Sequence, residues 1–197
     1  EIAQTASISP HDCVGSNLYL HTRNGKLMRT VPKENEAINE VWLSDRDRFA
    51  YQGVNSDDRL QQQMVKKADG WQPVEWEEAL HIVAQALRER VEAQGASQLG
   101  ILVSPGATLE EMSLVNQLAE GMGVNNIDHR LRQCDFTGQD KQPVFPFLGQ
   151  TIEELEHVNA ALVVGANPRK EQPIIGHRLR KAAQAGASMM FINPVDY

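Results

Sequence analysis

The feature that most constrains the fold is an alternation of helical and strand-like apolar patterns that begins at Pro73 and continues to the end of the sequence. Apolar residues recur at helical spacing over 76–91, and Gly95 is expected to end that helix. The continuous apolar run at 99–103 is typical of a strand buried on both faces. With a second strand near Ile127, this order predicts a parallel α/β layer with right-handed crossovers.

Two segments carry the sequence signature of a helix start. Thr108 with Glu111, and Thr151 with Glu154, have the spacing of a capping box. In this motif each side chain accepts a hydrogen bond from the backbone N–H of the other residue. Gly123 is expected to end the first of these two helices.

The C-terminal part of the pattern contains two more strands and one more helix. The apolar runs 160–164 and 189–192 predict the strands. Pro173 suits the first turn of the helix between them, and Gly186 is expected to end it. The inner face of this helix is expected to hold Leu179, Ala182 and Ala183.

The residues before this pattern form a different, β-rich part. Asn24-Gly25 separates two β-prone runs, 18–22 and 27–31, and predicts a hairpin because both turn residues tolerate positive φ. The charged run 45–48 alternates in sign and is interpreted as a solvated strip of ion pairs that adds little stability. The chain is expected to divide into a small β-rich subdomain at 1–60 and a Rossmann-like parallel α/β domain at 61–197.

Charge and cysteine content exclude several classes of protein. The 197 residues include 19 Lys and Arg against 26 Asp and Glu, a formal net charge of −7, so nucleic acids and anionic membranes are not expected as partners. No stretch reaches the roughly 20 apolar residues that a membrane span needs. Two cysteines, Cys13 and Cys134, are too few for a disulfide scaffold or a four-cysteine metal site.

Since the sequence starts at Glu1 and stops at Tyr197, just after a strand-like run, we expect a fragment without a signal peptide.

The loop 165–168 is a candidate binding site. Its sequence, Gly-Ala-Asn-Pro, follows a predicted buried strand and precedes a helix. Open α/β sheets bind ligands at this position, because free backbone N–H groups and the helix dipole point outward there. A turn with one Gly and one Pro also forms for backbone reasons alone. Nucleotide binding and a plain turn therefore both stay open.

Few other residues point to catalysis. The six histidines are scattered, and no two have the i, i+4 spacing of metal ligands on a helix. Cys134 lies near Arg130 and Arg132, whose charges would favour its thiolate form. It is a candidate nucleophile or metal ligand, or else a small buried apolar group.

Five sequence phrases resemble the G-type subunits of bacterial NADH-quinone oxidoreductases, the large peripheral-arm subunits of respiratory complex I. They are His-Asp-Cys-Val-Gly-Ser-Asn at 11–17, Glu-Asn-Glu-Ala-Ile-Asn-Glu at 34–40, Leu-Ser-Asp-Arg-Asp-Arg-Phe at 43–49, Leu-Arg-Gln-Cys-Asp-Phe at 131–136 and Ile-Asn-Pro-Val-Asp at 192–196. That family carries a domain similar to the molybdopterin oxidoreductases after its iron–sulfur N-terminal region. The resemblance implies that this chain is the start of that domain, with a truncated molybdopterin-oxidoreductase-like fold.

The resemblance also implies where an iron–sulfur cluster would be held. Related proteins bind a [4Fe–4S] cluster with the spacing C-x2-C-x3-C-x27-C. The same spacing selects Ser9, Asp12, Ser16 and Ser44, while Cys13 is one residue out of register. Because a serine hydroxyl stays protonated at neutral pH, we expect the cluster to be absent and the loops to be held by hydrogen bonds instead.

A second implied site concerns molybdenum. Cys134 falls where active relatives have the metal ligand. Gly165, Asn167 and Asn193 lie in loops similar to those that touch the pterin nucleotide in the family. We expect these positions to be vestigial, with no cofactor in this fragment and iron–sulfur clusters elsewhere in the parent subunit.

The leading hypothesis is a structural fragment without catalytic activity, within a complex that transfers electrons from NADH to quinone. Its expected partners are other peripheral-arm subunits, with no nucleic acid and no membrane insertion, on the cytoplasmic side of the bacterial inner membrane. Self-association through an unpaired strand edge is a further expectation. Two alternatives stay open: an active molybdopterin oxidoreductase that uses Cys134, and a free-standing nucleotide-binding domain that uses the Gly165 loop.

Overall fold

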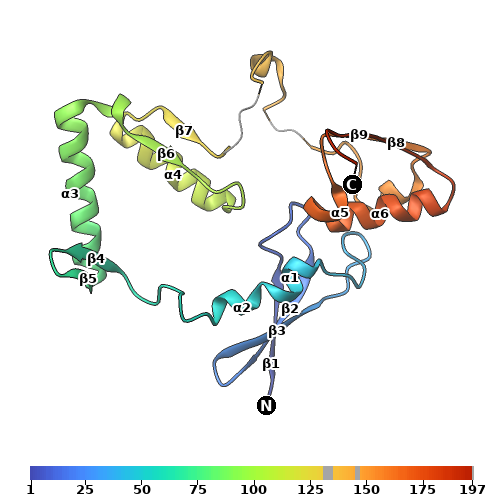
Figure 1. The fold of residues 1–197 in the computed structure, drawn as a ribbon, viewed down its shortest axis with the longest axis horizontal. Coiled ribbons are helices and arrows are strands. Elements are labelled where there is room, and N and C mark those ends of the chain that lie inside the picture. Colours follow the sequence, from blue (N-terminus) through green and yellow to red (C-terminus); the bar gives the residue numbers. More distant parts are fainter. Residues whose placement is uncertain (131–134, 145–146, 197) are drawn as a thin grey trace. The chain divides into compact units, whose positions relative to one another are not determined.

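A computed structural model describes the chain except for residues 131–134, 145–146 and 197. The described chain is a mixed α/β structure with small sheets, divided into two compact units (Figure 1). The first unit combines Glu1–Arg59 with Asp140–Tyr197, and the second is Leu60–Gln139. None of the described helices combines the length and the apolar character that a bilayer crossing requires.

The first unit begins with an antiparallel three-stranded sheet in the order β1-β2-β3. The strands are β1 (Ala3–Ile8), β2 (Asn17–Arg23) and β3 (Lys26–Pro32). The predicted hairpin is confirmed: Asn24 and Gly25 connect β2 to β3 with φ angles of 50° and 74°. These positive values are the backbone conformation that a tight hairpin turn requires.

Two short helices, α1 (Asp45–Phe49) and α2 (Tyr51–Val54), pack on β3. Leu18 and Leu43 are the buried apolar side chains of this part of the unit. The interpretation of 45–48 as a solvated strip of ion pairs is wrong. Asp47 is only 2% exposed, and no residue of this run belongs to an ion pair within the described part of the chain.

The rest of the first unit has a parallel pair of strands, β8 and β9, paired from Ala160↔Ser188 to Val164↔Ile192. Its elements are η3 (Glu153–His157), β8 (Ala160–Val164), α5 (Pro168–Glu171), α6 (Pro173–Gln184) and β9 (Ser188–Ile192), preceded by η2 (Gln139–Lys141) at the boundary between the units. Helix α6 packs against η3. It buries Ala182 as expected, but Ala183 is exposed and the charged Arg178 is buried instead.

The second unit contains a parallel pair of strands and two long helices. Its elements are β4 (Met64–Lys67), β5 (Gly70–Pro73), α3 (Trp76–Gln94), η1 (Ala96–Gln98), β6 (Gly100–Leu102), α4 (Leu109–Met122) and β7 (Asn126–Asp128). The predicted helix ends are confirmed, since Gly95 and Gly123 follow α3 and α4 with φ angles of 87° and 70°. The β4–β5 hairpin was not predicted.

The expectation that the strand at 99–103 is buried on both faces is wrong. Strand β6 pairs only with β7 among the described strands, and Leu102 is 62% exposed. Leu162 on β8 is similarly 56% exposed. A two-stranded sheet cannot enclose its own apolar side chains, whatever their sequence pattern. The parallel pairing itself is as expected, because β6 and β7 share one direction, as do β8 and β9.

Both predicted capping boxes are present. The Thr108 hydroxyl accepts from the Glu111 N–H at 3.2 Å, and the Glu111 carboxylate accepts from the Thr108 N–H at 2.8 Å. Thr151 and Glu154 form the same pair of hydrogen bonds, at 3.2 and 2.7 Å. The Thr108–Glu111 box satisfies two backbone donors at the start of α4 that would otherwise have no partner inside the helix, whereas Thr151 lies one residue before Ile152, the N-cap of η3.

Removing the α4 capping box is expected to loosen the first turn of that helix. Thr108→Ala should cost about 1 kcal/mol of local stability, which corresponds to about fivefold faster amide exchange in the first turn. Hydrogen exchange measured by NMR would test this. Ser113→Ala, at an exposed position inside the same helix, should leave exchange in the first turn unchanged. Equal exchange in the Thr108 variant and the parent chain would contradict the prediction.

Candidate functional site

The loop at 12–16 is closed by hydrogen bonds to one carboxylate. Asp12 Oδ1 accepts from the backbone N–H groups of Val14, Gly15 and Ser16 at 3.2, 2.9 and 3.3 Å. The Ser16 hydroxyl donates to Asp12 Oδ2. Gly15 has a φ of 72°, which this turn requires. Asp12 and Ser16, two of the four expected cluster positions, therefore pair with each other.

The other two expected positions meet at Asp47, a residue that was not predicted as part of a site. The Ser9 hydroxyl donates to Asp47 Oδ1 at 2.6 Å, and the Ser44 hydroxyl donates to Asp47 Oδ2 at 2.8 Å. Ser44 is also the N-cap of α1, accepting from the Asp47 N–H at 3.0 Å. The S-x-x-D pattern at 44–47 is a capping signature and could have identified Asp47 in the sequence.

A cavity of about 350 Å³ lies beside these loops, within the first unit. Ser44 and His11 contribute to its wall, together with residues of α5 and the start of α6. Its charged lining residues are Asp12, Asp45, Arg46, Arg169, Lys170 and Glu171. Three acidic and three basic side chains balance, so their charges give the cavity no preference for an anion.

The candidate loop at 165–168 follows β8, and Asn193 follows β9 at the same edge of the pair. The structure therefore brings the expected residues together: the Asn193 amide donates to the Ala166 carbonyl at 3.2 Å. The Gly165 N–H donates to the Ile192 carbonyl at 2.8 Å. The Asn167 N–H donates to Glu171 Oε2 at 3.0 Å. The Gly165 and Asn167 N–H groups, which a phosphate would use, thus already have partners in the protein.

Of the two cysteines, the structure describes Cys13. Cys13 is exposed, and its backbone N–H is 3.5 Å from Gln172 Oε1. Cys134, the expected molybdenum ligand, lies outside the described residues, as does its neighbour Arg132.

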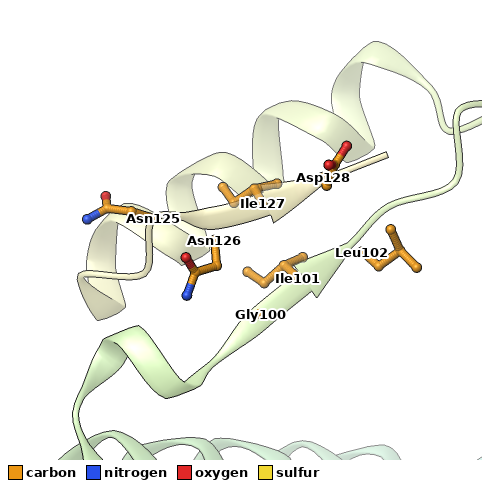
Figure 2. Close-up of a pocket in the computed structure, with 7 residues that line it drawn as sticks. All are labelled: Gly100, Ile101, Leu102, Asn125, Asn126, Ile127 and Asp128. Atoms are coloured by element: carbon orange, nitrogen blue, oxygen red, sulfur yellow. The ribbon is translucent and has the colours of Figure 1, made fainter. Parts of the chain in front are cut away.

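A hollow of about 420 Å³ lies on β6 and β7 in the second unit, and Figure 2 shows the residues that line it. Asp128 is the acidic residue of its lining. Asp128 Oδ1 accepts from the His129 N–H, the Arg130 N–H and Arg130 Nε at 2.7, 3.0 and 2.9 Å. The hydrogen bond from the Arg130 side chain is the main cause that lowers the pKa of Asp128 to about 2. Such a weakly basic carboxylate is a poor proton acceptor at neutral pH.

Five side chains of the first unit form an ion cluster: Glu40, Glu156, His177, Arg178 and Lys181. Arg178 Nη1 lies 3.2 Å from Glu40 Oε1 and also pairs with Glu156. Lys181 Nζ pairs with Glu40 and lies 2.6 Å from Glu156 Oε1. His177 Nε2 lies 2.7 Å from Glu40 Oε2. The ion cluster therefore joins residue 40 to η3 and α6.

Backbone contacts extend the ion cluster into the loop at 33–42. Arg178 Nη2 donates to the Glu36 carbonyl, and to the Ile38 carbonyl at 3.0 Å. Asn39, only 1% exposed, donates from Nδ2 to three backbone carbonyls. Glu40 has a φ of 47°, a conformation that costs energy for a residue other than glycine. The surrounding contacts hold it in that conformation.

The pKa values of the ion cluster follow from these contacts. A hydrogen bond from Lys181 is the largest cause that lowers the pKa of Glu40 to about 2, and His177 and Arg178 add to it. Desolvation raises the pKa of Glu156, but hydrogen bonds from Lys181 and Arg178 outweigh it, so that the net pKa is lowered. Hydrogen bonds to Glu156 and Glu40 raise the pKa of Lys181. The two carboxylates are therefore ionised and paired at neutral pH.

Comparison with known proteins decides the family. A family model described as molybdopterin oxidoreductase matches residues 59–196, well over half of the chain. The chain belongs to the molybdopterin oxidoreductase family. A second family model, described as NADH-ubiquinone oxidoreductase NDSU1/NuoG-like, 4Fe-4S domain, matches residues 2–52.

Two named relatives of the chain confirm its resemblance to the large subunit of complex I. The G-type subunit of the NADH-quinone oxidoreductase of Rickettsia bellii is 33% identical over 187 residues, 95% of this chain and 26% of the relative. The mitochondrial NADH dehydrogenase [ubiquinone] iron-sulfur protein 1 of Solanum tuberosum is 34% identical over 98% of this chain and 26% of the relative. The chain therefore spans about a quarter of the length of these curated relatives.

A solved structure confirms the fold at the level of the family. Acetylene hydratase from Pelobacter acetylenicus matches with a TM-score of 0.68 over 96% of this chain and 27% of that chain. The two sequences are 13% identical, so the likeness concerns the fold alone. The chain thus has a molybdopterin-oxidoreductase-like fold.

The cluster named in the second family model does not fit the residues present here. A [4Fe–4S] cluster is held by four cysteine thiolates. At the four positions expected from the cysteine spacing this chain has Ser9, Asp12, Ser16 and Ser44, and all four side chains are hydrogen-bonded within the protein. An anionic pterin nucleotide is also a poor fit, because the Gly165 and Asn167 N–H groups are already paired.

Proposed function

We propose that this chain is a structural, non-catalytic part of the large peripheral-arm subunit of an NADH:quinone oxidoreductase. The observation that carries the proposal is that the four expected cluster positions hold three hydroxyls and one carboxylate, all hydrogen-bonded, two of the hydroxyls to Asp47. Hydroxyl groups paired with carboxylates supply no thiolate for an electron-carrying centre. The similarity to the Rickettsia bellii subunit and to the mitochondrial iron-sulfur protein 1 supports the assignment to that complex, which transfers electrons from NADH to quinone.

The proposal assigns separate roles to two parts of the chain. Residues 1–60 are a cluster-type subdomain that has lost its ligands, and residues 61–197 are the start of the molybdopterin-oxidoreductase-like domain, with Rossmann-like layering. The family matches at 2–52 and 59–196 support this division. The parent subunit carries its iron–sulfur clusters in other regions. Electrons pass through those regions, while this chain supports them.

The proposed partners are the other peripheral-arm subunits, at the cytoplasmic face of the bacterial inner membrane. Among the described strands, β9 pairs only with β8. Its free edge is suited to recruiting another strand, so the isolated chain is proposed to self-associate.

Metal analysis of the purified chain tests the proposed function. The chain is produced and purified without oxygen, and its iron, sulfide and molybdenum are measured together with the electron paramagnetic resonance spectrum after reduction. We expect far less than one iron per chain and no stoichiometric molybdenum. About four irons per chain would overturn the proposal, and stoichiometric molybdenum would favour an active oxidoreductase. Thermal stabilisation by guanine nucleotides or NADH would favour a nucleotide-binding domain instead.

A further inference from the structure

The Asp47 carboxylate connects two segments that are distant in the sequence. Both of its oxygens accept from a serine: Oδ1 from Ser9 at 2.6 Å and Oδ2 from Ser44 at 2.8 Å. The Thr30 hydroxyl on β3 donates to the Asp47 carbonyl at 2.5 Å. Asp47 is 2% exposed, and the two serines are 8% and 6% exposed. Asp47 is therefore the centre of a buried and fully paired polar network.

This network occupies the place where a cluster would have to bind. Ser9 and Ser44 are the first and fourth of the expected cluster positions. A cluster bonded to side chains at both positions would need the space directly beside their terminal atoms. The Asp47 carboxylate lies within hydrogen-bonding distance of both hydroxyls, so it already fills that space. In addition, a buried carboxylate would repel thiolates at this distance.

We propose that Asp47 takes over the structural role of the missing cluster and also prevents one from binding. In place of metal–sulfur bonds, its carboxylate joins the end of β1 to the start of α1 through two serine hydroxyls. This inference rests on the proposed function, because it assumes a chain without a cluster. It adds that cysteines at the four positions are not sufficient to restore one.

Iron loading of engineered variants tests whether Asp47 prevents binding. A four-cysteine variant carries the substitutions Ser9→Cys, Asp12→Cys, Ser16→Cys and Ser44→Cys. Two further chains carry the same four cysteines and one more substitution each. One has Asp47→Ala, and the matched control has Asp45→Ala, a change at an exposed carboxylate of the same helix. Each chain is incubated without oxygen with ferrous iron and sulfide, desalted, and assayed for iron and visible absorption.

The expected result is at least threefold more iron in the Asp47→Ala form than in the four-cysteine variant or the Asp45→Ala control. Equal iron in all three chains, including none in any of them, would overturn the proposal that Asp47 prevents binding. The parent chain is measured in parallel. Four irons in that chain would refute the proposed function, whereas equal loading of the variants refutes only the role of Asp47.

A second measurement tests the structural role without introducing cysteines. Asp47→Asn should make amide exchange at residues 9–16 at least tenfold faster, because the amide cannot accept from both serine hydroxyls. Asp45→Asn should leave this exchange unchanged. Unchanged exchange in the Asp47→Asn chain would show that the carboxylate does not hold the loops. That result would overturn the proposal that Asp47 takes over the structural role of the cluster.

Discussion

Replacing Arg178 with methionine is expected to lower the free energy of unfolding of the first unit by about 3 kcal/mol. Methionine fills much of the same volume, but it leaves Glu40 and Glu156 without their most buried partner. The substitution also removes the donors of the Glu36 and Ile38 carbonyls. Breaking a buried ion pair by removing one partner is costly, because the remaining charge stays buried and poorly compensated.

Tryptophan fluorescence can measure the effect of the Arg178 substitution in the unit that contains it. Trp42 lies beside His177, with ring centroids 5.4 Å apart, and the other two tryptophans, Trp71 and Trp76, belong to the second unit. In a chain with Trp71→Phe and Trp76→Phe, urea unfolding followed by fluorescence therefore reports on the first unit.

The matched control for Arg178→Met is Arg180→Met. Arg180 is exposed, lies two residues along the same helix, and forms no ion pair within the described part of the chain. Its replacement should change the unfolding free energy by no more than about 0.5 kcal/mol. Equal effects of the two substitutions would show that the ion cluster is not a stabilising centre.

Local sequence signals predicted the features that depend on neighbouring residues. The Asn24-Gly25 turn, the two capping boxes and the Gly95 and Gly123 helix ends each depend on a few consecutive residues, and all are present. In contrast, burial depends on what covers an element. The runs at 99–103 and 160–164 have the apolar pattern of enclosed strands, yet each lies in a two-stranded sheet with exposed side chains.

The ion cluster and the Asp47 network of the first unit both depend on contacts between residues that are far apart in the sequence. Glu40 and Arg178 are separated by 138 positions, and Ser9 and Asp47 by 38. Neither pair leaves a periodic pattern, and a charged residue in a helix is normally expected to face solvent. Arg178 is instead buried on α6, next to the predicted inner-face residue Leu179. The resemblance to the large complex I subunit supplied the four expected cluster positions, but it did not identify Asp47 as the residue that joins two of them.

Stability of the first unit is expected to fall steeply between about pH 4.5 and pH 2. The pKa of Glu40 is lowered from 4.5 to about 2 in the folded chain, with the hydrogen bond from Lys181 as the largest cause. A carboxyl group with a lowered pKa stabilises the fold at pH values above its unfolded pKa, and this contribution is lost as pH falls through the folded pKa. The shift corresponds to at most about 3 kcal/mol.

Glu40→Gln isolates this contribution from those of the other acidic residues. At pH 7 the variant should be less stable than the parent chain, because the amide cannot form the ion pairs with Lys181 and Arg178. As the pH approaches 2, the parent chain protonates Glu40, so the difference between the two chains should shrink toward zero. Urea unfolding followed by Trp42 fluorescence at several pH values measures that difference.

The control for the pH experiment is Glu36→Gln. The Glu36 side chain is exposed and belongs to no ion pair within the described ranges, although its backbone carbonyl accepts from Arg178. This variant should follow the pH dependence of the parent chain. The Glu40→Gln chain could instead stay less stable by the same amount from pH 7 down to pH 2. Its lower free energy of unfolding would then come from altered packing or hydrogen bonding and not from a lost charge. The ionised carboxylate of Glu40 would then not be what holds the 33–42 loop against α6.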